Sequence, residues 1–116
     1  MFDEQRKTAK IVAELTMFFL SVGADKISSN VERRGNEEVI TFHADYLPEA
    51  EAKLEALNSL NEQKNNGIED IYWELAGSGN YGETSELLLV GMMLDRAEIV
   101  IENGFVNLTL YKELGN

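Results

Sequence analysis

The chain has 116 residues, of which 21 are Asp or Glu and 10 are Lys or Arg, so its net charge at pH 7 is −11. Such a charge repels phosphate backbones and anionic lipids, and we therefore expect neither a nucleic acid nor a membrane as partner. The chain contains no cysteine, which excludes disulfides and thiolate metal sites. We expect one cytoplasmic domain over residues 1–116, with enough chain to bury a core of its own.

Apolar residues at helical spacing predict a first helix over residues 8–22. Gly23 follows this stretch directly, as is typical of a residue that ends a helix. The apolar face of the helix consists of Ile11, Val12, Leu15, Phe18, Phe19 and Val22.

Two alternating runs joined by Gly35-Asn36 predict a first β-hairpin. A two-residue loop makes the apolar faces of the two runs coincide, whereas a slip of one residue would turn every side chain to the opposite face. His43 then points away from the core. The predicted partners are Val31 with Ile40, Ser29 with Phe42 and Ile27 with Ala44.

Pro48 suits the first turn of a second helix, for which Asp45 is a candidate cap. Asn65-Asn66-Gly67 ends this helix, and a short third helix is expected over residues 68–76. The apolar stripe of the second helix consists of Ala50, Leu54, Leu57 and Leu60.

A fourth helix, capped by Thr84 or Ser85, is expected to run to about Leu94. It is apolar nearly all round, so we expect it to be buried on several sides. Gly91 within it costs roughly 1 kcal/mol relative to alanine. A close contact with a neighbouring backbone would explain this glycine.

Asn103-Gly104 is a strong signal for a second hairpin, which pairs Ile101 with Val106, Ile99 with Leu108 and Ala97 with Leu110. The element order is therefore α-β-β-α-α-α-β-β. This order predicts an α+β fold in which two hairpins form one sheet that helices cover on one face. The first and fourth helices are the expected cover.

Few residues suggest catalytic or metal chemistry. His43 is the only histidine, and a zinc site would have to take its other ligands from carboxylates. Paired carboxylates are common in so acidic a chain, so no single pair indicates general acid–base catalysis. We predict no catalytic residue and no metal site.

Gly77, Gly79 and Gly82 lie in a loop that leads into the fourth helix, where backbone N–H groups can approach a phosphate. No Walker motif follows the glycines, and Glu83 and Glu86 at the start of the helix would repel phosphate. The same region contains Tyr72, Trp73 and Tyr81, which are either core anchors or part of an interface.

The element order resembles that of the GHKL ATP-binding fold of histidine kinases, gyrase and the small anti-sigma-factor kinases, over about residues 8–112. In that family the first helix carries a Glu followed four residues later by a magnesium-binding Asn; Glu14 matches the Glu, but Phe18 stands at the Asn position. Asp45 matches the adenine-binding Asp, but Tyr46-Leu47-Pro48-Glu49 replaces the glycines that follow it. The family's phosphate-contacting glycines would fall at Thr84 and Glu86. The resemblance therefore implies a degenerate member that does not hydrolyse ATP.

Three hypotheses follow. The leading one is a non-catalytic regulatory or protein-interaction domain, bacterial in character, that binds another protein or a second copy of itself without a cofactor. The alternative implied by the resemblance is an ATP-binding anti-sigma-factor-type kinase with altered motifs and with magnesium as cofactor. In that alternative Asp45 contacts the base, Glu14 lies near the metal, and Gly77, Gly79 and Gly82 form a lid. The third is a small-ligand sensor with Tyr72 and Trp73 lining its pocket.

Overall fold

The computed structural model describes residues 4–61 and 83–114. Its elements confirm the predicted α+β class and the order of a helix, a hairpin, further helices and a second hairpin. The helix predicted over residues 68–76 lies outside the described residues. The elements are α1 (Glu4–Ser21), β1 (Ile27–Arg34), β2 (Glu37–Asp45), η1 (Pro48–Asn61), α3 (Glu83–Met92), β3 (Arg96–Glu102) and β4 (Phe105–Glu113).

Both hairpin registers are confirmed, residue for residue: Val31 pairs with Ile40 in the first hairpin and Ile99 with Leu108 in the second. Gly35 has a φ of 61° in the first loop, while Asn103 and Gly104 have φ values of 56° and 80° in the second. In the second loop both central residues have a positive φ, which is the type I′ geometry for which Asn-Gly is suited.

The two hairpins join through β2 and β4, which gives the antiparallel strand order β1-β2-β4-β3. On the face towards the helices Ile40 pairs with Leu110, Phe42 with Leu108 and Ala44 with Val106, and all of these side chains are buried. The apolar faces of both hairpins therefore form one continuous core surface. β1 and β3 are left as the edges of the described sheet.

Helix α1 ends as Gly23 predicts. The N–H of Ala24 donates to the carbonyl of Phe19 at 3.0 Å, and the N–H of Gly23 donates to the carbonyl of Leu20 at 3.0 Å. Gly23 has a φ of 83°, which a residue with a Cβ rarely adopts. This pair of hydrogen bonds around a left-handed residue is a Schellman motif.

Residues Pro48–Asn61 form a 3₁₀ helix, η1, where the sequence suggests an α-helix. A 3₁₀ helix has three residues per turn, so residues three apart lie in one straight row. Leu54, Leu57 and Leu60 form such a row and are all buried. The leucine spacing of three therefore matches the helix type that forms.

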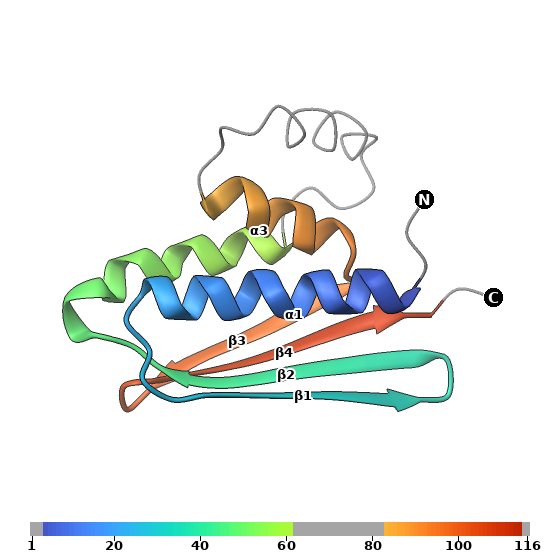
Figure 1. Ribbon diagram of the computed structural model, residues 1–116, viewed down its shortest axis with the longest axis horizontal. Helices are drawn as coiled ribbons and strands as arrows, with labels where there is room; N and C mark the ends of the chain where they lie inside the picture. The colour runs from blue at the N-terminus through green and yellow to red at the C-terminus, as the bar shows by residue number, and fades with distance from the viewer. Residues whose placement is uncertain (1–3, 62–82, 115–116) are drawn as a thin grey trace.

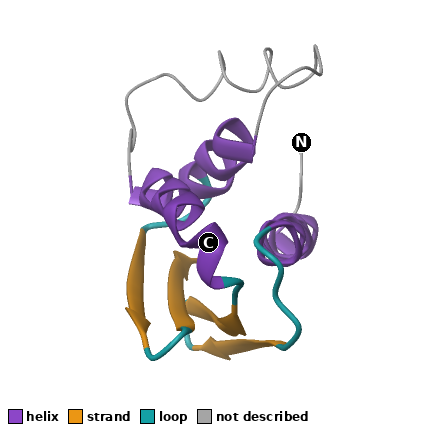
Figure 2. Ribbon diagram, turned by 90° about the vertical axis from the view of Figure 1, so that its left-hand side faces the viewer, coloured by secondary structure: helices purple, strands orange, loops and turns teal. Residues whose placement is uncertain are grey.

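The cover of the sheet differs from the expectation. α1 packs against β1 and β2, η1 packs against β3, and α3 packs on η1 and α1. Figure 1 and Figure 2 show these helices on one side of the sheet. η1 takes the place expected for α3 because its leucine row faces the sheet. Helix α3 begins at Glu83, so Thr84 and Ser85 lie within its bounds.

Gly91 occupies the closest contact between the helices. A Cβ at this position would lie 2.7 Å from the carbonyl oxygen of Leu60 and 2.9 Å from its Cα. The predicted close backbone contact is therefore confirmed. Leu87, Leu89 and Val90 of α3 are buried, which confirms burial of this helix on several sides.

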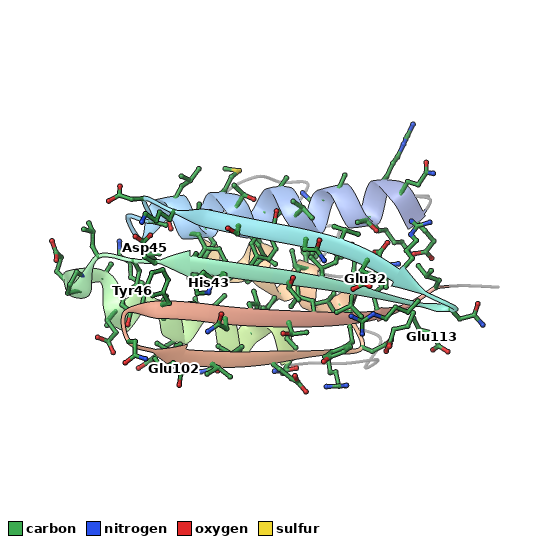
Figure 3. The ribbon with its side chains drawn as sticks, turned by 90° about the horizontal axis from the view of Figure 1, so that it is seen from below. Glu32, His43, Asp45, Tyr46, Glu102 and Glu113 are labelled. Carbon is green, nitrogen blue, oxygen red and sulfur yellow. The ribbon has the colours of Figure 1, made fainter. Side chains whose placement is uncertain are left out.

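The opposite face of the sheet carries no helix among the described elements, as Figure 3 shows from below. No helix in the described ranges combines the length and the apolarity that crossing a membrane requires.

Candidate functional site

Of the residues of the nucleotide-binding alternative, the structure describes Glu14 and Asp45 and does not bring these two together. Glu14 lies on α1, in the helical layer, and accepts a hydrogen bond from Lys10 Nζ at 3.1 Å. Asp45 lies on β2 beside the buried Ala44, so its side chain is on the opposite face with His43. Figure 3 shows Asp45 and His43 on that face. The sheet therefore separates Glu14 from Asp45.

Asp45 has a structural partner. Its Oδ1 accepts hydrogen bonds from the backbone N–H groups of Asp25 at 2.8 Å and Lys26 at 3.0 Å, which ties the end of β2 to the loop before β1. The hydrogen bond from Lys26, aided by that from Asp25, lowers the pKa of Asp45 below its usual 3.8. This carboxylate holds a loop, and it does not cap η1 as the sequence suggested.

Phe18, at the position where the family resemblance has a metal-binding Asn, is a core residue. Its ring packs edge-on against Phe19 with 5.5 Å between ring centroids, and its side chain is buried. The glycines Gly77, Gly79 and Gly82 and the aromatic residues Tyr72, Trp73 and Tyr81 all lie outside the described residues.

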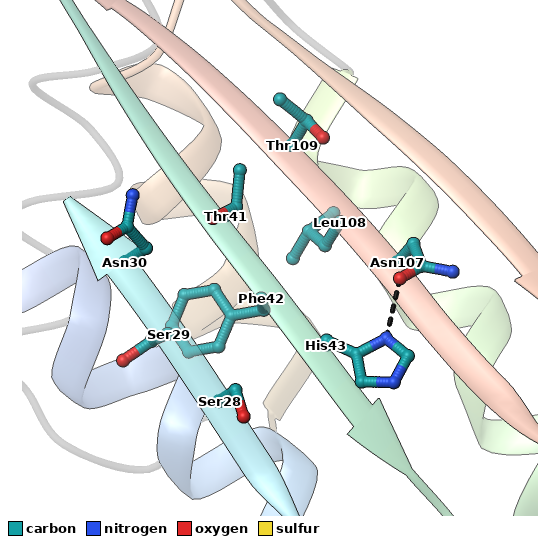
Figure 4. Close-up of a pocket in the computed structure, with 9 residues that line it drawn as sticks. All are labelled: Ser28, Ser29, Asn30, Thr41, Phe42, His43, Asn107, Leu108 and Thr109. Carbon is teal, nitrogen blue, oxygen red and sulfur yellow. Dashed lines mark hydrogen bonds between the residues drawn. The ribbon is translucent and has the colours of Figure 1, made fainter. Parts of the chain in front are cut away.

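His43 lies in a depression of about 440 Å³ on the uncovered face of the sheet. Its Nδ1 is 2.6 Å from Asn107 Oδ1, and its ring stacks on Phe105 with 4.6 Å between centroids. Because the amide oxygen can only accept, Nδ1 is the donor of this hydrogen bond. Figure 4 shows the hydrogen bond between His43 and Asn107.

The other residues that line the depression supply hydroxyl, amide and apolar groups and no charge. His43 therefore has no carboxylate beside it in the depression with which to form an acid–base pair. Within residues 4–61 and 83–114 no group of His, Asp and Glu side chains could hold a metal ion. The depression is a hydrogen-bonding surface without a carboxylate or a Lys or Arg side chain in its lining.

A second candidate site lies at the free edge of β3. Asn61, the last residue of η1, uses its side-chain amide as a strand would use its backbone. Asn61 Nδ2 donates to the carbonyl of Ala97 at 2.9 Å, and the N–H of Ala97 donates to Asn61 Oδ1 at 2.9 Å. The edge is therefore closed at Ala97.

Beyond Ala97 no described residue pairs with the edge. Alternate residues of an antiparallel strand direct their backbone groups to the same side. Ile99 and Ile101 therefore point their N–H and C=O groups away from β4, as Ala97 does. In the described part of the chain these groups have no hydrogen-bond partner.

A groove of about 470 Å³ runs beside this open edge, between η1 and β3. Ile99, Ile101 and Leu54 supply apolar surface, and Ile101 keeps 41% of its surface exposed. Glu51 and Glu55 of η1 also line the groove. Within the described ranges, two features that a peptide requires, unpaired backbone and apolar surface, thus adjoin one another.

The other edge strand, β1, offers less apolar surface to a partner strand. Its residues from Ser28 to Arg34 are all exposed, and Val31 is the only large apolar side chain among them. The remaining residues are polar or charged, a composition that discourages pairing at an edge.

Sequence reasoning predicted β3 and its apolar face but not this site. The signal was available in Ile99 and Ile101, but only the strand order shows that they lie at an edge. The role of Asn61 had no signal, because its partner Ala97 is distant in the sequence. No family model matches the chain, and no curated protein matches it.

Proposed function

We propose that the protein is a non-catalytic interaction domain that binds an extended segment of another protein along β3. The observation that carries this proposal is the outward-facing backbone of Ile99 and Ile101, which no described residue pairs with, beside an apolar groove. An added strand would form main-chain hydrogen bonds with these residues, and its side chains would enter the groove. This is the mode of recognition known as strand addition.

The boundaries of the open edge support a short segment. The side chain of Asn61 is hydrogen-bonded to both backbone groups of Ala97, and the hairpin loop begins at Asn103. Between these two limits, Ile99 and Ile101 are the residues whose outward N–H and C=O groups can pair with an added strand. Each added hydrogen bond contributes about 0.5–1.5 kcal/mol, so the backbone alone supports weak binding and the groove must supply the rest.

The experiment is selection of short peptides from a random displayed library on the intact protein, followed by mapping with NMR. We expect selected peptides to shift the backbone amide signals of Ile99 and Ile101. A peptide in an added strand uses the N–H groups of alternate residues only. Methylation of one alternate set of peptide nitrogens should abolish binding, and methylation of the other set should leave it intact.

The β1 edge is the internal control. Shifts of the amide signals of Ser29 and Val31, in place of those of Ile99 and Ile101, would place the binding site on β1 and contradict the proposal. Equal tolerance of methylation at both alternate sets would also contradict it, because side chains alone would then carry the binding.

A further inference from the structure

We infer that the segment taken up by β3 carries arginine or lysine at the positions that face the groove, with apolar residues between them. This inference rests on the proposed function and names the chemistry of the partner. It comes from the combination of surfaces that line the groove: apolar groups from β3 and carboxylates from η1.

The apolar surface of the groove matches a hydrocarbon chain. Ile99 and Ile101 come from β3 and Leu54 and Ala52 from η1. A long side chain lying in the groove would cover the exposed part of Ile101. Arginine and lysine have such stems and can keep the charged head in water.

The charge of the groove is negative. Glu51 and Glu55 are exposed, and neither makes an ion pair with a described residue. Lysine and arginine are absent from the residues that line the groove in the described structure. A cationic head group at this place would therefore meet carboxylates without competition from a neighbouring cation.

The basic residue of β3 itself does not neutralise the groove. Arg96 pairs with Glu98 at 2.6 Å, and its guanidinium lies 3.7 Å from the centroid of the Tyr111 ring. These partners hold it on the uncovered face of the sheet, where alternation places residues 96, 98 and 100. Val100, which is 49% exposed on that face, is the natural contact for the apolar residues of the segment.

Charge also distinguishes a partner from a second copy. A dimer through two β3 edges would bring together Glu51, Glu55 and Glu102 of both copies, in a chain whose net charge is −11. Like charges placed face to face disfavour such a pairing. The occupant that the groove fits is a basic segment of a different protein.

The test uses a short synthetic peptide of alternating arginine and valine. Its control replaces each arginine with citrulline, which has the same shape and no charge. Titrations of the intact protein at low ionic strength give both dissociation constants, and NMR shifts of the Ile99 and Ile101 amides locate the binding. We expect the arginine peptide to bind about tenfold more tightly, the effect of a few exposed ion pairs.

Variants separate the groove from the overall charge. Glu51→Lys with Glu55→Lys should remove the preference for arginine over citrulline. The matched control, Glu37→Lys with Glu49→Lys, makes the same change of net charge at exposed residues outside the groove and should keep the preference.

The outcomes are distinct. If the citrulline peptide binds as tightly at Ile99 and Ile101, the inference on charge fails and strand addition stands. If neither peptide shifts these amides, this inference is overturned, and failure of the library-selected peptides as well would end the proposed function. If both control and groove variants lose the preference equally, the attraction is general and the groove is not its source. Concentration-dependent dimers that protect the same amides would identify a second copy as the occupant and overturn the inference.

Discussion

The side-chain amide of Asn61 exchanges two hydrogen bonds, both 2.9 Å long, with the backbone of Ala97. The residues are far apart in sequence, and the contact fastens the end of η1 to the start of β3. It also determines where the free edge begins. An asparagine can do this because its amide presents a donor and an acceptor in the same plane, as a peptide group does.

Asn61→Ala is expected to destabilise the protein by about 1–3 kcal/mol, since it leaves the N–H and C=O of Ala97 without partners. Urea unfolding measures the loss, and hydrogen exchange at Ala97 should become faster. Asn58→Ala is the matched control, because Asn58 is exposed on the same helix and makes no hydrogen bond to a described residue. Equal stability of the two variants would show that the Asn61 contact contributes nothing.

Gly91→Ala is expected to destabilise the protein although alanine favours a helix. The new Cβ would lie 2.7 Å from the carbonyl oxygen of Leu60, and a backbone cannot yield as a side chain can. Overpacking of this kind costs about 1–3 kcal/mol, and the gain in helix propensity of about 1 kcal/mol offsets part of it. Thermal unfolding measures the balance.

Ala13→Gly is the reverse change at an exposed position of α1, so it measures the contribution of helix propensity alone to the free energy of unfolding. It should destabilise the protein by about 1 kcal/mol. If Gly91→Ala proved stabilising, α3 and η1 would have to be farther apart than the structure places them.

Arg33→Met is expected to cost about 1.5–3 kcal/mol, the range for hydrogen bonds to charged groups. Arg33 Nε donates to Glu38 Oε2 at 2.9 Å, and the Glu38 side chain is fully buried. Thr8 donates to the other carboxylate oxygen at 2.5 Å, so the loss of Arg33 leaves the buried carboxylate with Thr8 as its one hydrogen-bond partner among the described residues. Chemical unfolding measures the effect.

Arg34→Met is the matched control for Arg33→Met. Arg34 pairs with Glu32 at 2.7 Å, but both side chains are more than half exposed. Such pairs contribute about 0–1 kcal/mol because water screens them. Equal losses for the two variants would contradict a special role for the buried carboxylate.

The stability of the protein is expected to depend on Asp45 at acid pH. Hydrogen bonds from the loop backbone lower the pKa of Asp45 in the folded state below its ordinary value of 3.8. The unfolded state therefore binds more protons in this range, and the contribution of Asp45 is complete well above pH 3.8. It is lost as the pH falls through 3.8 towards the lower pKa of the folded state.

Asp45→Asn keeps an oxygen acceptor and removes the charge. The variant should be less stable than the parent protein at pH 7. The difference between their free energies of unfolding should narrow on acidification. Urea unfolding at pH 7 and at an acid pH measures both. Asp25→Asn is the control, because the Asp25 carboxylate makes no hydrogen bond to a described residue. A gap that stays constant with pH would contradict the role assigned to the Asp45 charge.

The sequence by itself determined the two hairpins and the end of α1, but not the 3₁₀ type of η1. Asn103-Gly104 and Gly35-Asn36 specified hairpin registers because turn geometry and alternation act over a few residues. Gly23 specified the end of α1 for the same reason, and Gly91 indicated a close helix contact. The resemblance to the GHKL fold, with Glu14 and Asp45 as its matching residues, stays a prediction.

Tertiary structure alone decided which strands meet and which remain free. The pairing of β2 with β4 leaves β3 at an edge, and the contact of Asn61 with Ala97 limits how much of that edge is open. Nothing near Asp45 in the sequence shows that its carboxylate binds a loop on the far face from Glu14. These features depend on residues distant along the chain, and local propensity and periodicity contain no information about such pairs.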